Sequence, residues 1–219
     1  MYCPGSSTTS TITVSQSQLS GVSTTSDGGV FYIAGTGAKS VLIQLSSTIT
    51  SVASGGSGGI LYVSATSSHL IELNSVTVES LTASGDGAVY YPASATSITL
   101  RVIGSTFKSF QSSLLGSFTS IKTLTGSNTL SVTLTGSTFT CKASSIWGSW
   151  PAVYNSVVTQ LGAATPSTIG GLFYVQSAAS GSTITSSNNV FQQCYTTTTG
   201  SVFYLPTGVV LNDDSSTFK

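Results

Sequence analysis

The sequence predicts an all-β fold, namely a right-handed parallel β-helix of roughly seven coils, each with three short strands and about 29–30 residues. Two markers support this prediction: a glycine turn that leads into an aromatic run, and a short apolar segment that precedes the turn by a constant distance. One unit repeated at this period is typical of a solenoid, in which each coil buries its apolar side chains against its neighbours. The expected winding is right-handed because parallel crossovers almost always are.

The first marker is the glycine turn. Its first glycine occupies positions 28, 58, 87, 116, 148, 170 and 200, and the first three steps are nearly equal. The residues that follow, as in Val30-Phe31-Tyr32-Ile33, are aromatic and β-branched and therefore favour a strand. We expect each turn to close one coil and to set the register of the strand after it.

The second marker is an apolar-x-x-apolar segment that begins nine positions before the glycine. Its first residues are Leu19, Ile49, Val78, Phe107, Phe139 and Phe191. A third apolar run, found at 41–45, 70–73, 98–102 and 130–134, lies between the glycine turn and this segment. Three strands separated by Ser-, Gly- and Asn-rich corners make up one coil of a parallel β-helix with three sheets.

Charged residues are scarce. Only 5% of the 219 residues are charged and the net charge is zero, while 39% are hydrophobic and 9% are aromatic. Disordered chains are usually poor in aromatic and β-branched residues, so this composition favours β structure. Six Lys and Arg without a cluster do not suit a nucleic-acid partner. Zero net charge also removes repulsion between copies, so we expect the chain to associate.

We expect a single domain over residues 1–219, with no transmembrane segment, because no run of about 18 apolar residues occurs. The N-terminal residues also lack the pattern of a signal peptide. The repeat breaks near 148–170, where the turn glycines are closer together than in the other coils, and we interpret this region as a shortened, irregular coil. Trp147 and Trp150 lie there together, either repacking a narrowed core or forming a docking spot for a ligand or a neighbouring chain.

Both ends of the sequence resemble parts of coils. Ile12-Thr13-Val14 is similar to a middle strand, and Thr217-Phe218-Lys219 is similar to the start of another apolar-x-x-apolar segment. Solenoids normally carry polar caps, because an open end exposes core residues and unpaired strand edges. We therefore expect either a segment of a longer repeat chain or a subunit whose end completes the coil of the next copy, which generates filaments.

With this repeat, the chain resembles right-handed β-helices of the pectin-lyase-like superfamily. The pattern is most similar to polymorphic outer-membrane-type and protist surface proteins, whose repeats combine Gly-Gly-Ala-Ile/Val with Phe-x-x-Asn. Gly87-Ala88-Val89-Tyr90 approximates the first motif, whereas Phe107-Lys108-Ser109-Phe110 has the frame of the second without its Asn. The resemblance covers most of the chain at the level of the fold. It implies an extracellular or cell-surface location and a structural or adhesive use.

No constellation of catalytic residues is apparent, and we expect no enzymatic activity, cofactor or metal site. Asp213 and Asp214 are consecutive, and consecutive strand residues face opposite ways, so they do not form a carboxylate pair over one cleft. His69 is the one histidine, and we expect it at a strand edge without the acid partner of a catalytic triad.

The three cysteines are an odd number and do not pair completely within the chain. We place Cys141 and Cys194 two coils apart, about 10 Å, which is beyond the reach of a disulfide, and expect both to be small core residues. Cys3, near the terminus, is a candidate for a bridge between molecules. No Asn-x-Ser/Thr sequon occurs, so any attached sugar is expected to be O-linked at corners such as 196–199.

Two pairs of opposite charges are separated by one repeat. Glu72 lies one period before Arg101, and Glu79 lies one period before Lys108. This spacing places each pair side by side on adjacent coils, about 4.8 Å apart along the stack. We predict two cross-coil ion pairs whose main effect is on register, because exposed pairs contribute little to stability.

The aromatic strands supply the candidate partner surface. One column comprises Phe31, Leu61, Tyr90, Phe173 and Phe203, and the next comprises Tyr32, Tyr62, Tyr91, Tyr174 and Tyr204. Adjacent strand residues face opposite ways, so one column lies inside and the other outside. We expect the outer column either to be ordinary surface or to bind glycans or a lateral protein chain.

The sequence thus favours a non-enzymatic, extracellular structural or adhesive solenoid that assembles end to end into a fibre. The alternative is a carbohydrate-binding or carbohydrate-degrading β-helix. A cleft with two acids would favour the enzyme, and smooth sheets would favour the fibre.

Overall fold

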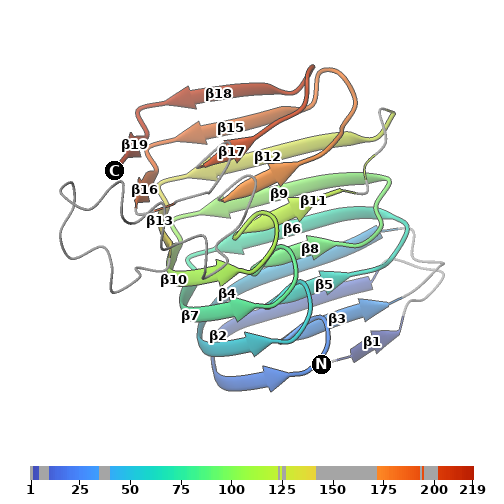
Figure 1. Ribbon diagram of the computed structural model, residues 1–219, viewed down its shortest axis with the longest axis vertical. Helices are drawn as coiled ribbons and strands as arrows, with labels where there is room; N and C mark the ends of the chain where they lie inside the picture. Colours follow the sequence, from blue (N-terminus) through green and yellow to red (C-terminus); the bar gives the residue numbers. More distant parts are fainter. Residues whose placement is uncertain are drawn as a thin grey trace.

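The computed structural model describes residues 2–4, 10–34, 40–122, 124, 127–141, 172–192, 194 and 202–219. These residues form an all-β solenoid of parallel strands without a helix, as predicted (Figure 1). The described residues make about five turns, slightly fewer than the roughly seven coils predicted, and the first sheet stacks seven strands. The irregular coil expected near 148–170, with Trp147 and Trp150, lies outside the described residues.

The first sheet contains the aromatic strands, one above the other. Its order is β1 (Tyr2–Pro4), β3 (Phe31–Ala34), β5 (Leu61–Val63), β8 (Tyr90–Pro92), β11 (Thr119–Ile121), β14 (Phe173–Val175) and β17 (Phe203–Tyr204). The register keeps equivalent positions together, as in Phe31↔Leu61 and Phe173↔Phe203. Strand β11 pairs directly with β14, although Ile121 and Phe173 are far apart in the sequence.

The other two strands of each coil join into one 12-stranded sheet. The middle strands are β6 (Ser68–Asn74), β9 (Ser97–Ile103), β12 (Thr129–Thr135), β15 (Thr183–Ser187) and β18 (Val210–Asp214). The third strands are β7 (Thr77–Ala83), β10 (Thr106–Ser112), β13 (Thr138–Cys141), β16 (Val190–Gln192) and β19 (Thr217–Phe218). The long strands β2 (Ser10–Thr24) and β4 (Ser40–Ser54) run through the corner, so the predicted second and third sheets are continuous there.

A left-handed residue in the third strand explains the apolar-x-x-apolar spacing. In a regular strand, residues three apart face opposite ways, yet Ile49 and Val52 are both buried. Ser51, between them, has φ 55°, and Ser80 and Ser109 adopt the same conformation in β7 and β10. A single residue in the left-handed conformation reverses the inward–outward alternation of the strand. Both apolar ends of the segment therefore face the core.

The glycine turn is required by two close approaches. Gly58 has φ 65°, and a Cβ on it would lie 2.5 Å from the carbonyl oxygen of Leu61. A Cβ on Gly59 would lie 2.6 Å from the carbonyl oxygen of Ala88 in the next coil. The turn therefore brings neighbouring coils too close for a side chain, and the predicted role of the motif in register has a steric cause.

A ladder of buried polar side chains lines the corner between the middle and third strands. Ser105, Ser137 and Asn189 occupy equivalent positions in successive coils and are buried. The Ser105 N–H donates to Ser137 Oγ at 3.1 Å, and the Ser137 N–H donates to Asn189 Oδ1 at 2.9 Å. Each side chain thus satisfies a backbone group that the sharp corner removes from the strand ladder.

Candidate functional site

The two aromatic columns of the first sheet divide between core and surface. Phe31, Leu61, Tyr90 and Phe173 are buried in the core, whereas Phe203 is half-buried. The other column faces outwards: Tyr32, Tyr62 and Tyr91 are partly exposed, Tyr174 is nearly buried and Tyr204 is exposed. The outer tyrosines are therefore the candidate partner surface.

The outer tyrosines stack on one another along the solenoid. Ring centroids lie 4.9 Å apart between Tyr32 and Tyr62, 5.6 Å between Tyr62 and Tyr91, and 5.0 Å between Tyr174 and Tyr204. Partial burial, followed by the nearby carboxylate of Asp27, raises the pKa of the Tyr62 phenol to about 12. The Tyr62 phenol is therefore uncharged at neutral pH. The ring contacts along the column cover ring faces, which leaves the ring edges for a partner.

Ser120 interrupts this column. The register places it level with Tyr174 on one side, and Thr119 pairs with Tyr90, which places Ser120 beside Tyr91 on the other. Its side chain is fully buried, and its hydroxyl has no hydrogen-bond partner. Among the described residues, one face of Tyr91 and one face of Tyr174 therefore have no aromatic neighbour in the column at this level.

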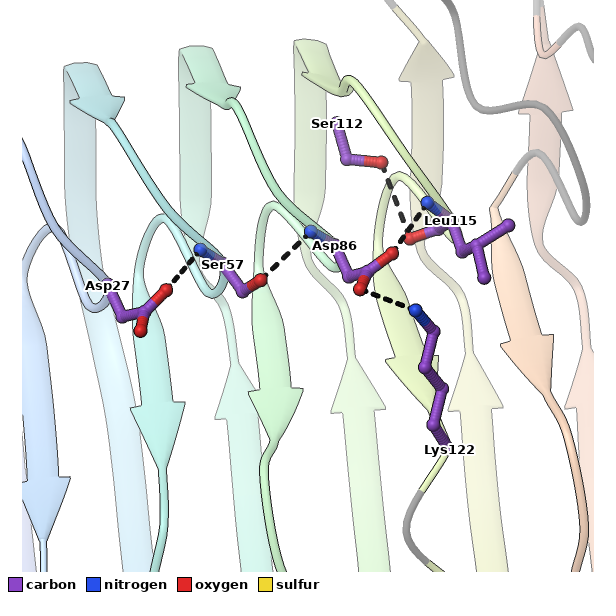
Figure 2. Close-up of polar contacts among 6 residues, drawn as sticks. All are labelled: Asp27, Ser57, Asp86, Ser112, Leu115 and Lys122. Carbon is purple, nitrogen blue, oxygen red and sulfur yellow. Dashed lines mark hydrogen bonds and ion pairs between the residues drawn. The ribbon is translucent and has the colours of Figure 1, made fainter.

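A charged pair occupies the interruption. Lys122 Nζ lies 2.7 Å from Asp86 Oδ2, and Figure 2 shows the lysine side chain extending from the end of β11 back towards the turn that carries Asp86. Lys122 is two residues beyond Ser120 and shares its outward face, so the lysine stem crosses the Ser120 level. Burial, followed by the charge of Asp86, raises the pKa of Tyr91, and burial, followed by Tyr204 and Asp86, raises the pKa of Tyr174.

Asp86 is held by a ladder of turn residues (Figure 2). The Ser57 N–H donates to Asp27 Oδ1 at 2.6 Å, and the Asp86 N–H donates to Ser57 Oγ at 3.0 Å. Asp86 Oδ1 in turn accepts a hydrogen bond of 2.8 Å from the Leu115 N–H. One carboxylate oxygen is thus committed to the backbone, and the other is available to Lys122.

The sequence contains a signal for this pair that lies outside the repeat markers. In the three coils before β11, the outer tyrosine is followed two positions later by a small residue, as in Tyr32-Ile33-Ala34 and Tyr91-Pro92-Ala93, whereas Tyr174 is followed by Gln176. The β11 coil has Ser120-Ile121-Lys122 instead. The Lys122 side chain therefore fills part of the space that a tyrosine ring at position 120 would occupy. The pairing itself was missed because Asp86 and Lys122 are 36 residues apart, which is not the repeat period.

The two predicted cross-coil ion pairs are present on the outer surface. Arg101 Nη1 lies 2.9 Å from Glu72 Oε1, and Lys108 Nζ lies 3.5 Å from Glu79 Oε1. The Gln44 amide donates to Glu72 Oε2 at 2.7 Å and, with Arg101, holds the pKa of Glu72 below its usual value. The Lys108–Glu79 pair is exposed and the Arg101–Glu72 pair is partly exposed, so both favour the correct register more than they stabilise the fold.

The expectation of a strand-edge His69 is wrong. His69 lies in β6, which is paired on both sides, and its ring is buried. Nδ1 lies 2.8 Å from the Tyr90 hydroxyl and Nε2 lies 2.8 Å from the Ala65 carbonyl oxygen. Because that carbonyl only accepts, Nε2 carries the proton and Nδ1 accepts from Tyr90. Burial lowers the pKa of His69 to about 4, so the ring is neutral at physiological pH.

The expectation that Cys141 and Cys194 are unpaired is also wrong. They form a disulfide with a Cα–Cα distance of 5.0 Å across a sequence separation of 53 residues. The error arose from counting an extra coil between them, whereas β13 pairs directly with β16 and the two cysteines belong to adjacent levels. The side chain of Cys3 and residues 196–199 lie outside the described part of the chain.

The remaining acids form no site. Asp213 and Asp214 pair with Ser186 and Ser187, and the alternation of β18 places the two carboxylates on opposite faces. Within the described residues, no group of three or more His, Cys, Asp or Glu is arranged to hold a metal ion. The same part of the chain contains no helix long and apolar enough to cross a membrane.

Comparisons with known proteins did not identify a related protein. No family model, curated protein or solved structure matches the chain. The agreement with the pectin-lyase-like superfamily is therefore limited to the parallel β-solenoid itself.

Proposed function

We propose that this protein is a non-enzymatic, extracellular structural or adhesive solenoid that associates end to end into a fibre. The observation that supports it most is the continuity of the apolar columns through the stack. Leu211 of β18 continues the column that begins at Ile12, and Phe218 of β19 continues the column that begins at Leu19. A second copy could place its β2 level on the β18–β19 level without changing the register.

The exposed side chains of the outermost described level fit this proposal. Leu211 is 40% exposed and Phe218 is 52% exposed, whereas their column neighbours Ile184 and Phe191 are buried. At the other outermost level, Ile12 and Leu19 are only partly buried. Stacking one level on the other would remove these apolar surfaces from water and pair the free strand edges.

Two further features support the proposed extracellular location and the proposed lack of enzymatic activity. The Cys141–Cys194 disulfide is of the kind that persists in oxidising, extracellular environments. Glu72, Glu79 and Asp86 are each engaged by a cation, which does not suit a pair of carboxylates acting on one glycosidic bond. The alternative of carbohydrate binding without hydrolysis rests on the interruption of the tyrosine column at Ser120.

Sedimentation velocity over a range of protein concentrations tests the proposal. The purified chain should form species much larger than a monomer, and Phe218→Asp should reduce them by placing an unpaired charge in the junction. Leu114→Asp is the matched control, because Leu114 is 49% exposed but belongs to a turn within the stack. Equal association of wild type and Phe218→Asp would contradict the end-to-end junction.

A further inference from the structure

We propose that the interruption of the tyrosine column at Ser120 is a binding slot for one pyranose ring, with Lys122 as its movable cover. The slot is defined by Tyr91, Ser120, Tyr174, Asp86 and Lys122. It lies on the side of the solenoid, so it does not depend on the fibre and should be occupied in a monomer as well.

The spacing of the walls fits one ring. Tyr91 and Tyr174 are two levels apart, with Ser120 between them, so about 9.6 Å separates them along the stack. The stacked tyrosines elsewhere in the column have centroids 4.9 to 5.6 Å apart. A single six-membered ring midway between Tyr91 and Tyr174 would therefore contact both aromatic faces at the distance that the rest of the column uses.

The polar groups at this level select a ring with hydroxyls on its rim. Ser120 has a fully buried hydroxyl without a partner, on the outward side of β11. Asp86 is nearly buried, and its Oδ2 accepts from Lys122. A purely aromatic guest would leave this carboxylate unpaired, which is unfavourable in a buried setting. A pyranose presents C–H groups to both faces and hydroxyl donors around its edge, and so satisfies Tyr91, Tyr174, Asp86 and Ser120 together.

Lys122 is the group that can move. Its side chain is 30% exposed, whereas that of Asp86 is 8% exposed and is anchored by the Leu115 N–H. Figure 2 shows the Lys122 side chain directed at Asp86. When Lys122 rotates outwards, its ammonium group enters water and its stem leaves the Ser120 level. Asp86 stays in place and exchanges the lysine for sugar hydroxyls.

The test is saturation-transfer NMR with methyl glycosides of glucose, galactose and N-acetylglucosamine, followed by titration of whichever binds. Tyr91→Ala and Tyr174→Ala should each weaken binding about tenfold, since each removes one aromatic face. Tyr32→Ala, a tyrosine of the same column two levels from the slot, should leave the affinity unchanged within twofold.

A variant in which a tyrosine ring fills the slot tests the proposal more sharply than the alanine variants do. Ser120→Tyr combined with Lys122→Ala reproduces the Tyr-x-Ala pattern of Tyr91-Pro92-Ala93, so it should fold and should abolish binding. The proposal is overturned if no glycoside gives a signal, or if the filled variant binds as the wild type does. Binding of p-cresol in place of all glycosides would also overturn it, because the guest would then be aromatic.

Discussion

Acidification should destabilise the solenoid through one buried side chain, His69. Its pKa is lowered from 6.5 to about 4 in the folded chain, since burial disfavours the charged ring more than the hydrogen bond to the Ala65 carbonyl oxygen favours it. The unfolded chain therefore binds a proton first as the pH falls below 6.5, which favours unfolding. The loss grows to about 2 kcal/mol at pH 5 and to about 3.4 kcal/mol once the pH is well below 4.

Carboxylates do not obscure this effect in the upper part of the range. The pKa of Glu72 is lowered in the folded state, so its contribution is lost only as the pH falls below the ordinary carboxylate range. The window from pH 6.5 to 5 therefore reports mainly on His69.

Urea unfolding monitored by circular dichroism at pH 7.0, 6.0, 5.5 and 5.0 measures the effect. The midpoint of the wild type should fall steadily, whereas His69→Gln, which cannot titrate, should be less stable at pH 7 but nearly insensitive to pH in this range. Parallel pH profiles for the wild type and His69→Gln would refute the reasoning.

Three further predictions concern the disulfide, the β-bulge at the left-handed serine of the third strand (Ser109 in β10) and the outermost described level. Replacing Cys141 and Cys194 by Ala should lower the free energy of unfolding by about 4 kcal/mol, as expected for a bridge across 53 residues, and chemical denaturation without reductant checks this value. Ser109→Gly should stabilise the fold by up to about 1 kcal/mol and Ser109→Val should destabilise it, because φ at this residue is 53°; equal thermal midpoints for the two variants would contradict the bulge. Asp213→Leu should lower the concentration needed for association about tenfold or more, since Asp213 occupies the inward column of Leu134 and Ser186 and an end-to-end junction would bury its charge. Asp214→Leu, on the outward face, should not reproduce this effect in light scattering.

The features that recur at the repeat period could be predicted from the sequence. Glu72 and Arg101 are one period apart, and parallel in-register stacking brings any such pair together. The alternation of Phe31 and Tyr32 likewise follows from strand geometry, although the sequence did not show which column is buried. Local pattern and stacking point to the same structure at these positions, so the prediction needs no tertiary information.

The features that depart from the period could not be predicted in the same way. Cys141 and Cys194 are adjacent in space because β13 pairs directly with β16, whereas the spacing of the glycines suggested a further coil between them. Lys122 reaches Asp86 through a long side chain that runs back along its own strand, so its partner is set by reach and not by register. His69 replaces an apolar residue at an inward position, where a hydrogen bond from Tyr90 compensates for burial.

Electron microscopy of the purified chain tests most directly whether the apolar columns that end at Leu211 and Phe218 continue from one molecule into the next. We expect unbranched filaments with an axial subunit repeat of about 34 Å, from seven strand levels in the first sheet at about 4.8 Å each. Phe218→Asp should shorten or abolish them, and Leu114→Asp should not. Discrete particles of monomer size at every protein concentration, for the wild type as for Phe218→Asp, would contradict the end-to-end fibre.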